Sequence, residues 1–335
     1  MYFASIDAHA KVLHVAVLDK GATLVYEEEL PSDPERLRAA LAPFRPLRVV
    51  VETCPFWPWI ADALQAPDVD FRLAHATKLR AIATSAHKND AVDARLLARM
   101  LHSDLIPCAY PRTPAERERL RLLRHRAALV RTRSALAARI HAQLHQANLV
   151  LEREQLLRVR TRTWLREVAE PRLMPEQRRL LRSHLALIDA LAPFIKETDR
   201  EIRRTSQLDP LAELLRTVPG IGHFWALLLA AELSPLSRFP DEAHFVSYCG
   251  LAPITRSSGG HTRHGSLPSA ANRWVRWALI SAVAKHIQKA PHSALSRYYE
   301  RQRVRVGWKK ARVAAARKLA TILFHMLRRQ QRWRG

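Results

Sequence analysis

Four acidic residues in the first part of the chain could together hold metal ions. Asp7 and Glu52 each lie in or at the end of an apolar stretch, whereas Asp90 and Asp93 are three residues apart. A carboxylate among apolar neighbours is unfavourable unless a cation offsets its charge, and an i, i+3 pair shares one helical face. Four converging carboxylates suit two Mg²⁺ or Mn²⁺ ions about 3.5–4 Å apart, which promote phosphodiester transfer. The ordinary alternatives are a strand-ending turn at Asp7 and acids that complement a helix dipole.

A second set of reactive residues lies in the Gly- and Ser-rich segment 250–266. Ser257 and Ser258 precede two glycines, and Arg256 and Arg263 flank them. A serine hydroxyl is a weak nucleophile unless a base or metal takes its proton, and guanidinium groups stabilise charge on a pentavalent phosphorus. Serine attack on DNA would leave a phosphoserine link that conserves bond energy for rejoining. On the pattern alone, a flexible surface loop is the favoured interpretation, and either serine could be the nucleophile.

The charge balance indicates nucleic acid as the partner. The chain has 55 Lys and Arg against 31 Asp and Glu, a net charge of +24. Phosphate neutralisation supplies much of the binding energy of such proteins. No apolar run approaches the roughly 18 residues that a membrane span needs, and no signal peptide opens the sequence, so we expect no membrane partner. The three cysteines have no paired spacing, which argues against disulfides and zinc sites.

Several motifs could contact nucleic acid directly. Segment 217–222 contains a Pro-Gly-x-Gly turn typical of a helix-hairpin-helix, in which glycines let backbone N–H groups approach a phosphate, although any tight turn between helices can use them. Segments 272–278 and 307–312 interleave Trp with Arg or Lys, and there we expect the cations to face nucleic acid and the tryptophans mostly to pack. The predicted contacts are Lys88, Gly220, Gly222, Arg256, Arg263, Arg273, Arg276, Lys309 and Lys310.

The elements that must position the four acids are typical of an α/β domain of the ribonuclease H-like class. Period-two alternation predicts three antiparallel strands, and crossover units with helices follow. Right-handed crossovers place the fourth strand beside the first, so Asp7 and Glu52 would face one gap on strands about 4.8 Å apart. The predicted strands are 2–8, 12–18, 22–30, 47–51 and 69–73, with helices after Ser32 or Asp33 and over 56–64, 77–84 and 90–101.

From Thr113 onwards the pattern is helical. Two long helices, 113–152 and 175–206, carry narrow apolar stripes that predict an antiparallel coiled-coil hairpin, either a spacer, dimer contact or nucleic-acid arm, or a plain solvated hairpin. The stripe of the first is Leu120, Leu123, Ala127, Val130, Ser134, Ala137, Leu144 and Leu151. A C-terminal, mainly helical region follows, with helices over 272–288 and 293–332. The predicted domains are 1–112, 113–206 and 207–335.

Taken in order, these motifs resemble the DEDD transposases of the insertion sequence 110 family over nearly the whole chain. Ser5-Ile-Asp7 resembles the family's first acidic motif, Val51-Glu52-Thr53 its second, and the segment from Asp90 to Asp93 its third and fourth. Val218-Pro-Gly-Ile-Gly222 and the segment from Gly250 to Gly259 resemble the hallmarks of its C-terminal domain. The resemblance implies a RuvC-like domain that holds Mg²⁺, a coiled coil, and a second domain with Ser258 as nucleophile.

The resemblance also implies partners. The active site of such proteins is composite, with the acids and the serine supplied by different protomers of a dimer or tetramer, and a structured non-coding bridge RNA pairs with donor and target DNA. The protein would act in the bacterial cytoplasm, at the nucleoid. Two places depart from the family pattern: Ser269 and Ala271 replace a usual Lys and Gly, and Asn89 replaces a frequent Thr.

Two other functions fit the same residues. A metal nuclease of the Holliday-junction-resolvase type would use water in place of Ser258. A non-catalytic nucleic-acid-binding scaffold would carry the same basic surface with a degenerate acidic cluster.

Overall fold

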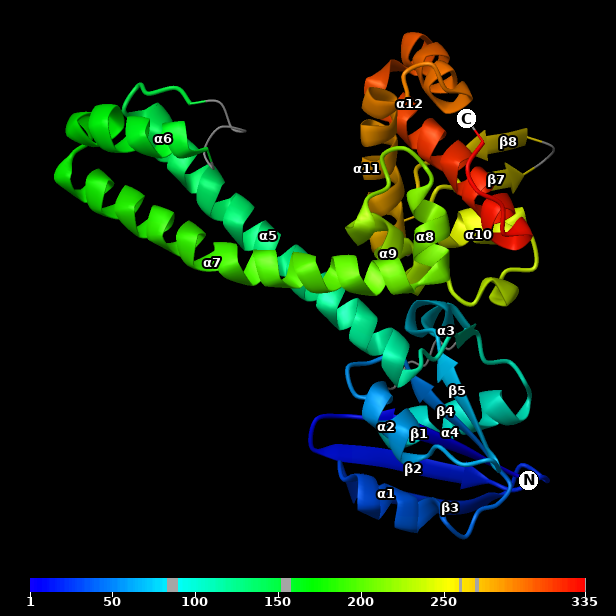
Figure 1. The fold of residues 1–335 in the computed structure, drawn as a ribbon. Coiled ribbons are helices and arrows are strands. Elements are labelled where there is room, and N and C mark those ends of the chain that lie inside the picture. Colours follow the sequence, from blue (N-terminus) through cyan, green and yellow to red (C-terminus); the bar gives the residue numbers. More distant parts are fainter. Residues whose placement is uncertain (83–89, 152–157, 259–260, 269–270, 335) are drawn as a thin grey trace. The chain divides into compact units, whose positions relative to one another are not determined.

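The chain divides into two units, Met1–Arg117 and Glu118–Gly335 (Figure 1). The computed structural model describes residues 1–82, 90–151, 158–258, 261–268 and 271–334. Within these ranges no helix has both the length and the apolar character needed to cross a bilayer. The division into three domains remains a prediction.

A six-stranded mixed sheet forms the centre of the first unit. Its order is β3-β2-β1-β4-β5-β6, and β1 pairs antiparallel with β2 and parallel with β4. The predicted adjacency of the first and fourth strands is therefore confirmed. The two-residue β6 was not predicted, because two residues are too few to show an alternation. The strands are β1 (Tyr2–Ala8), β2 (Val12–Leu18), β3 (Leu24–Pro31), β4 (Leu47–Glu52), β5 (Val69–Ala74) and β6 (Cys108–Ala109).

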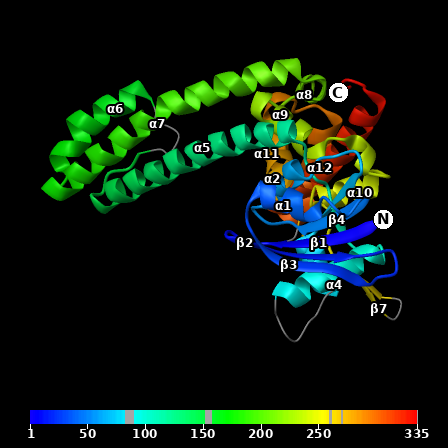
Figure 2. The same cartoon turned by 90° about the horizontal axis from the view of Figure 1, so that it is seen from below.

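Helices cover both faces of this sheet (Figure 2). On one face, α1 (Pro34–Leu41) and α2 (Trp57–Ala63) pack against alternate residues of β1 such as Ile6. On the other, α4 (Asp90–His102) packs against Phe3 and its neighbours, and α3 (Ala76–Ile82) precedes it. Asp33 caps α1 by accepting hydrogen bonds from the backbone N–H groups of its first turn. This mixed sheet with helices on both faces is the predicted ribonuclease H-like, RuvC-like architecture.

The second unit begins with a long helical hairpin. Its arms are α5 (Pro114–Gln146) and α7 (Pro175–Leu208), which lie side by side in Figures 1 and 2. Arg126 of α5 pairs with Asp199 of α7 at 2.8 Å. The linking segment contains α6 (Val159–Trp164), the π-helical η2 (Leu165–Ala169) and the 3-10 helix η3 (Glu170–Arg172), none of which was predicted.

The apolar stripe predicted for α5 is wrong in its middle. Ser134 is exposed, whereas Leu136 and Ile140 are buried. The two ends of α5 pack against different partners, because Leu120 and Leu123 join the C-terminal core and Leu136 and Ile140 join a separate cluster with α7 and η2. One continuous stripe therefore does not describe this helix.

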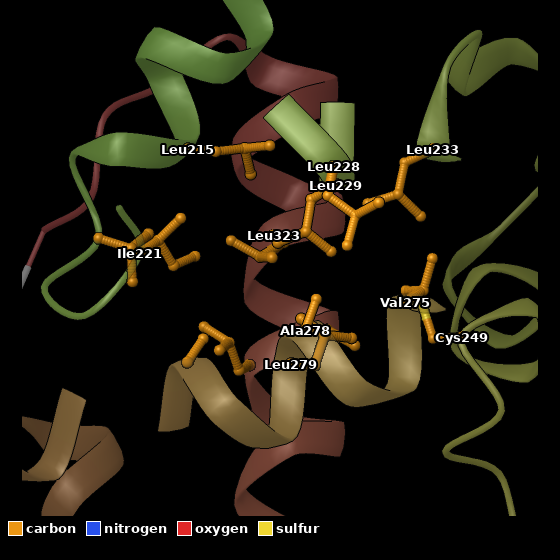
Figure 3. Packing of buried hydrophobic residues seen from close by; sticks show 14 of the residues in the cluster. Leu215, Ile221, Leu228, Leu229, Leu233, Cys249, Val275, Ala278, Leu279 and Leu323 are labelled. Atoms are coloured by element: carbon orange, nitrogen blue, oxygen red, sulfur yellow. The ribbon is translucent and has the colours of Figure 1, made fainter. Parts of the chain in front are cut away.

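The remaining helices of the second unit enclose a large apolar core. Figure 3 shows Leu228 and Leu229 of α9, Leu279 of α11 and Leu323 of α12 gathered together. This core surrounds α9, whose residues Ala226 to Leu233 are all buried, and this explains why the helix is apolar on every side. These elements are α8 (Pro210–Arg216), α9 (His223–Leu233), η4 (Leu236–Arg238), α10 (Glu242–Tyr248), α11 (Arg273–Lys289) and α12 (Ala294–Arg329).

Two features of this unit differ from the sequence prediction. The segment expected to be a flexible loop contains an antiparallel ribbon, β7 (Thr255–Ser258) paired with β8 (His261–His264). Its strands consist of polar residues, so no apolar alternation signals them. The last helix is not continuous, because Gly307 has φ 77° and ψ 161° and interrupts α12.

The turn between α8 and α9 is held against α11. The buried His286 of α11 donates a hydrogen bond from Nδ1 to the Pro219 carbonyl oxygen at 2.8 Å, and its Nε2 lies 2.7 Å from Ser293 Oγ. Burial lowers the pKa of His286, which favours this neutral form. Gly220 has φ 98°, and a Cβ at this position would lie 2.5 Å from the His286 backbone nitrogen. Only glycine fits there.

Replacement of Gly220 by alanine therefore tests the packing of this turn. We expect Gly220→Ala to lower the free energy of unfolding by about 2 kcal/mol or more, from the left-handed φ and the collision with α11. Gly222→Ala is the matched control, since φ is −91° and a Cβ would meet nothing within 4 Å. It should cost less than about 1 kcal/mol. Urea denaturation measures both, and equal losses would contradict the assigned role of Gly220.

Candidate functional site

Asp7 and Glu52 lie at the adjoining carboxyl ends of two parallel strands. The register pairs Ile6 of β1 with Val51 of β4, and Asp7 and Glu52 are the next residue on each strand. Alternation places Asp7 on the same face as Phe3, and Glu52 on the same face as Val50. Phe3 and Val50 pack with α4. Both carboxylates therefore lie on the face of the sheet that α4 covers.

The charges of both carboxylates act on the thiol of Cys54. Burial raises the pKa of Cys54, and the charges of Glu52 and Asp7 raise it further against two backbone hydrogen bonds that lower it. Asp7 is partly buried, with 26% of its side chain exposed. Two like charges at one partly buried place repel each other unless a cation or a proton offsets them.

A buried hydrogen bond fixes the first turns of α4 against the same strand. Ser5 Oγ donates to the Ala94 carbonyl oxygen at 2.5 Å, and Ser5 is fully buried. Asp93 immediately precedes Ala94 and is partly buried. Asp90 is the first residue of α4, but its side chain lies outside the described part of the structure. The start of α4 is thus held on the face of β1 that carries Asp7.

The donor set suits a hard cation, although the described side chains do not by themselves form a metal centre. Carboxylate oxygens are the ligands that Mg²⁺ and Mn²⁺ prefer. Among the side chains that the structure describes, which do not include that of Asp90, no three His, Cys, Asp or Glu are grouped closely enough to hold a metal. Asp7 has a partner that sequence reasoning missed, since His9 Nε2 lies 3.3 Å from its carboxylate. The only signal was the Asp-x-His spacing at the end of β1.

The predicted serine lies at the end of a strand in the second unit. Ser258 is the last residue of β7 and pairs with His261, while Ser257 pairs with Thr262. Arg256 and Arg263 lie opposite each other in the same ladder. The side chains of these residues lie outside the description. Backbone hydrogen bonds between Ile254 and residues Gly265 and Ser266, at 2.7 and 3.0 Å, extend the pairing towards the base of the hairpin.

A buried carboxylate joins the elements on either side of this serine hairpin. Glu232 of α9 is 1% exposed and accepts a hydrogen bond from Asn272 Nδ2 at 2.9 Å. Tyr248, at the end of α10, donates to the Glu232 carbonyl oxygen at 3.2 Å and accepts from Asn272 at 3.0 Å. Asn272 also caps α11. Because Tyr248 precedes the hairpin and Asn272 follows it, Glu232 ties both flanks together.

Arg276 holds the same two flanks from α11. Its guanidinium donates to the Pro268 carbonyl oxygen at 2.5 Å. It also lies against Gly250, where φ is 68° and a Cβ would meet Arg276 Nη2 at 2.5 Å. Burial lowers the pKa of Arg276, and the nearby charge of Arg273 adds to this effect. Arg276 was predicted to contact nucleic acid, and here it holds the base of the serine hairpin.

The other predicted nucleic-acid contacts are distributed over several elements. Gly220 and Gly222 lie in the turn between α8 and α9, and Lys88 lies outside the described residues. The side chains of Arg273, Lys309 and Lys310 are exposed. Of the tryptophans expected mostly to pack, Trp274 packs against the core, Trp277 contacts Trp225 and Trp274 yet is 44% exposed, and Trp308 is 52% exposed. The buried face of α11 follows Val275, Ala278 and Ala282, and Trp277 lies off it.

The Glu232 network can be tested by removing its charge. Glu232→Gln should lower the free energy of unfolding by about 2–3 kcal/mol, because Asn272 and Arg124, 3.2 Å away, lose a buried anionic acceptor. It should also speed amide hydrogen exchange in residues 250–268. Glu213→Gln is the control, since it removes a half-exposed i, i+3 pair with Arg216 and should cost less than about 1 kcal/mol. Unchanged exchange in Glu232→Gln would refute the anchoring role.

Comparison with known families gives two matches in this chain. Residues 4–149 match a model of DEDD transposases of the IS110 type, described as "Transposase". Residues 212–300 match the model described as "Transposase IS116/IS110/IS902 family". The first segment contains Asp7, Glu52 and the start of α4, and the second contains the serine hairpin and the Glu232 network.

Curated relatives agree with these matches. An uncharacterised protein of insertion element IS116 from Streptomyces clavuligerus is 32% identical over 42% of this chain and 35% of its own length. The transposase for insertion sequence element IS1328 from Yersinia enterocolitica is 26% identical over 86% of this chain and 85% of its own. The transposase for IS1111A from Coxiella burnetii is 23% identical over 74% and 69%.

The first two relatives, from IS116 and from IS110 of Streptomyces coelicolor, are matched over only 35% and 32% of their lengths, so this chain spans about a third of each. The two family models nevertheless match both units of the chain, and the order of their segments is that of the motifs described above. The chain belongs to the IS110 family of DEDD transposases.

Proposed function

We propose that this chain is a DNA transposase, a site-specific recombinase that cuts and rejoins DNA by Mg²⁺-assisted attack of Ser258 on phosphodiesters. The observation that carries the proposal is the placement of Asp7 and Glu52 at adjoining ends of β1 and β4, with the start of α4 fixed on the same face by Ser5. This arrangement occurs within the segment that matches DEDD transposases.

In this proposal Asp7, Glu52, Asp90 and Asp93 hold Mg²⁺ or Mn²⁺. The ions, when bound, activate the attacking oxygen and stabilise the leaving oxygen. Ser258 Oγ loses its proton and forms a bond to phosphorus, one phosphorus–oxygen bond of the DNA strand breaks, and the departing sugar oxygen takes up a proton. Arg256 and Arg263 would stabilise charge on the phosphoryl oxygens.

The Glu232 network has a positioning role in this scheme. It holds Tyr248 and Asn272, and therefore both flanks of the hairpin that carries Ser258. A nucleophile that forms a bond in one fixed geometry gains from such restraint, because small displacements of the reacting atoms reduce the rate strongly.

We further propose that the chain acts as a homo-oligomer, a dimer or tetramer, in which the acids and Ser258 of one active site come from different copies. The support is the family resemblance, together with the location of the two sets in different units of the chain.

A covalent protein–DNA adduct distinguishes serine attack from hydrolysis. With Mg²⁺ and DNA carrying the ends of its element, the wild-type protein should form an adduct stable to denaturing electrophoresis. Ser258→Ala should abolish it, and Asp7→Asn should reduce adduct formation by at least about a hundredfold, since the metal would lose a ligand. Ser257→Ala is the matched control and should retain the adduct.

Each alternative function predicts a different result for the same variants. Cleavage that persists in Ser258→Ala without any adduct would indicate a resolvase-type nuclease that uses water. DNA binding without cleavage, unchanged in Asp7→Asn, would indicate the non-catalytic scaffold. Loss of the adduct in Ser257→Ala alone would assign the nucleophile to Ser257.

We propose that a structured RNA from the same element guides target choice. The net charge of +24 suits several strands of nucleic acid at once, and the family resemblance suggests the RNA. Protein expressed together with its flanking element should copurify with one discrete RNA from that locus, and sequencing identifies it. The same protein expressed without the flanks is the control. Recovery of only bulk cellular RNA in both preparations would contradict RNA guidance.

A further inference from the structure

A cavity of about 570 Å³ lies between α5, α9 and α11 in the second unit. Its α5 wall includes Ala127, Val130 and Arg131, which share one helical face because they are spaced at i, i+3 and i+4. Its other wall is aromatic and consists of Phe224, Trp225 and Trp277. The volume is in the range of cavities that bind small organic ligands. The proposed chemistry at Ser258 and the acids does not use it.

The aromatic wall is a connected set of rings. Trp225 and Trp277 meet edge to face with centroids 4.5 Å apart, and Phe224 meets Trp225 at 4.9 Å in the same way. Trp274 continues the set, 5.7 Å from Trp277. The rings hold one another in fixed orientations, yet Trp277 is 44% exposed. The cavity thus presents a rigid indole to whatever enters it.

Arginines lie along the α5 wall. Arg126 is fixed over the Phe224 ring, 4.9 Å from its centroid, and is paired with Asp199 at 2.8 Å. Arg131, five residues further along α5, is exposed. The cavity therefore combines flat apolar walls with a cationic rim. Planar bases that carry phosphate match both features, since base–aromatic stacking and phosphate neutralisation are the two usual contacts to single strands.

We propose that this cavity binds one unstacked nucleobase, stacked on Trp277, with its phosphate at Arg131. The inference rests on the proposed action on nucleic acid and adds to it a site for a base that has left its stack. Strand exchange requires such bases, because paired strands must separate before they pair anew. A single-stranded DNA segment and an RNA segment present the same chemistry to the cavity.

The test uses the full-length protein in EDTA, so that metal-dependent cleavage does not contribute. Single-stranded 12-nucleotide DNA and RNA with one central 2-aminopurine report stacking through loss of fluorescence. Wild-type protein should quench the signal, and Trp277→Ala should weaken binding about tenfold and remove the quenching. Trp277→Phe keeps an aromatic ring and should retain most of the binding affinity and most of the quenching.

Matched variants separate stacking from general effects. Phe194→Ala removes an aromatic side chain of similar exposure, 55%, from α7 and should change neither the binding affinity nor the quenching. Arg131→Gln should weaken binding more than Arg133→Gln, which removes the same charge from a different face of α5. A 12-nucleotide strand that is abasic at every position should bind wild-type protein and Trp277→Ala equally, because it offers no base to stack. The base comes from whichever nucleic acid, DNA or RNA, loses more binding affinity in Trp277→Ala.

The outcomes distinguish this inference from the proposed function. Strong binding by wild-type protein with quenching unchanged in Trp277→Ala, or an Arg131→Gln effect equal to that of Arg133→Gln, would overturn the cavity assignment alone. Failure of wild-type protein to bind either oligonucleotide would also overturn the cavity assignment, whereas the proposed function is decided separately by the Ser258-dependent adduct. Thermal unfolding of each variant identifies any loss of binding that comes from misfolding. If Trp277→Ala misfolds, wild-type protein alone decides the question, since it should bind the strand with bases more tightly than the abasic strand.

Discussion

The parallel pairing of β1 with β4 is the constraint on which the candidate catalytic centre depends. It places Asp7 and Glu52, forty-five positions apart in the sequence, at the ends of neighbouring strands. Two carboxylates at this separation repel each other, and burial of part of Asp7 makes that repulsion stronger. The sheet tolerates the arrangement because its apolar faces are packed on both sides, by α1 and α2 on one and by α4 on the other. The stability of the sheet thus maintains a concentration of negative charge that suits a divalent cation.

A single buried carboxylate has the corresponding role in the second unit. Glu232 is one of few acidic groups in a strongly basic region, and its hydrogen bonds to Asn272 and its ion pair with Arg124 offset the cost of its desolvation. The result is a rigid base for a polar ribbon that contributes little apolar surface of its own. A large apolar core around α9 supports the carboxylate, and the carboxylate in turn restrains the hairpin.

Excess positive charge has two uses in this chain. Some arginines are engaged within the protein: Arg119 pairs with Asp209 at 2.6 Å, and Arg126 pairs with Asp199. Others, such as Arg131 and Lys310, project into solvent. The first group orders α5 against its neighbours, and the second generates the field that attracts phosphate. Net charge predicts the partner class, but only the ion pairs separate the two groups.

The sequence by itself determined most of the first unit and the class of its chemistry. The strands 2–8 and 12–18 and the adjacency of the first and fourth strands followed from alternation and from the handedness of crossovers. Tertiary structure alone decided what depends on distant partners: the two different packing faces of α5 and the exposure of Trp277. The His9–Asp7 pair and the polar ribbon β7–β8 are local, but no apolar alternation marks either of them. The physical reason is that local periodicity records which side of an element is apolar, whereas burial, ion pairing and cavities depend on which other element packs there.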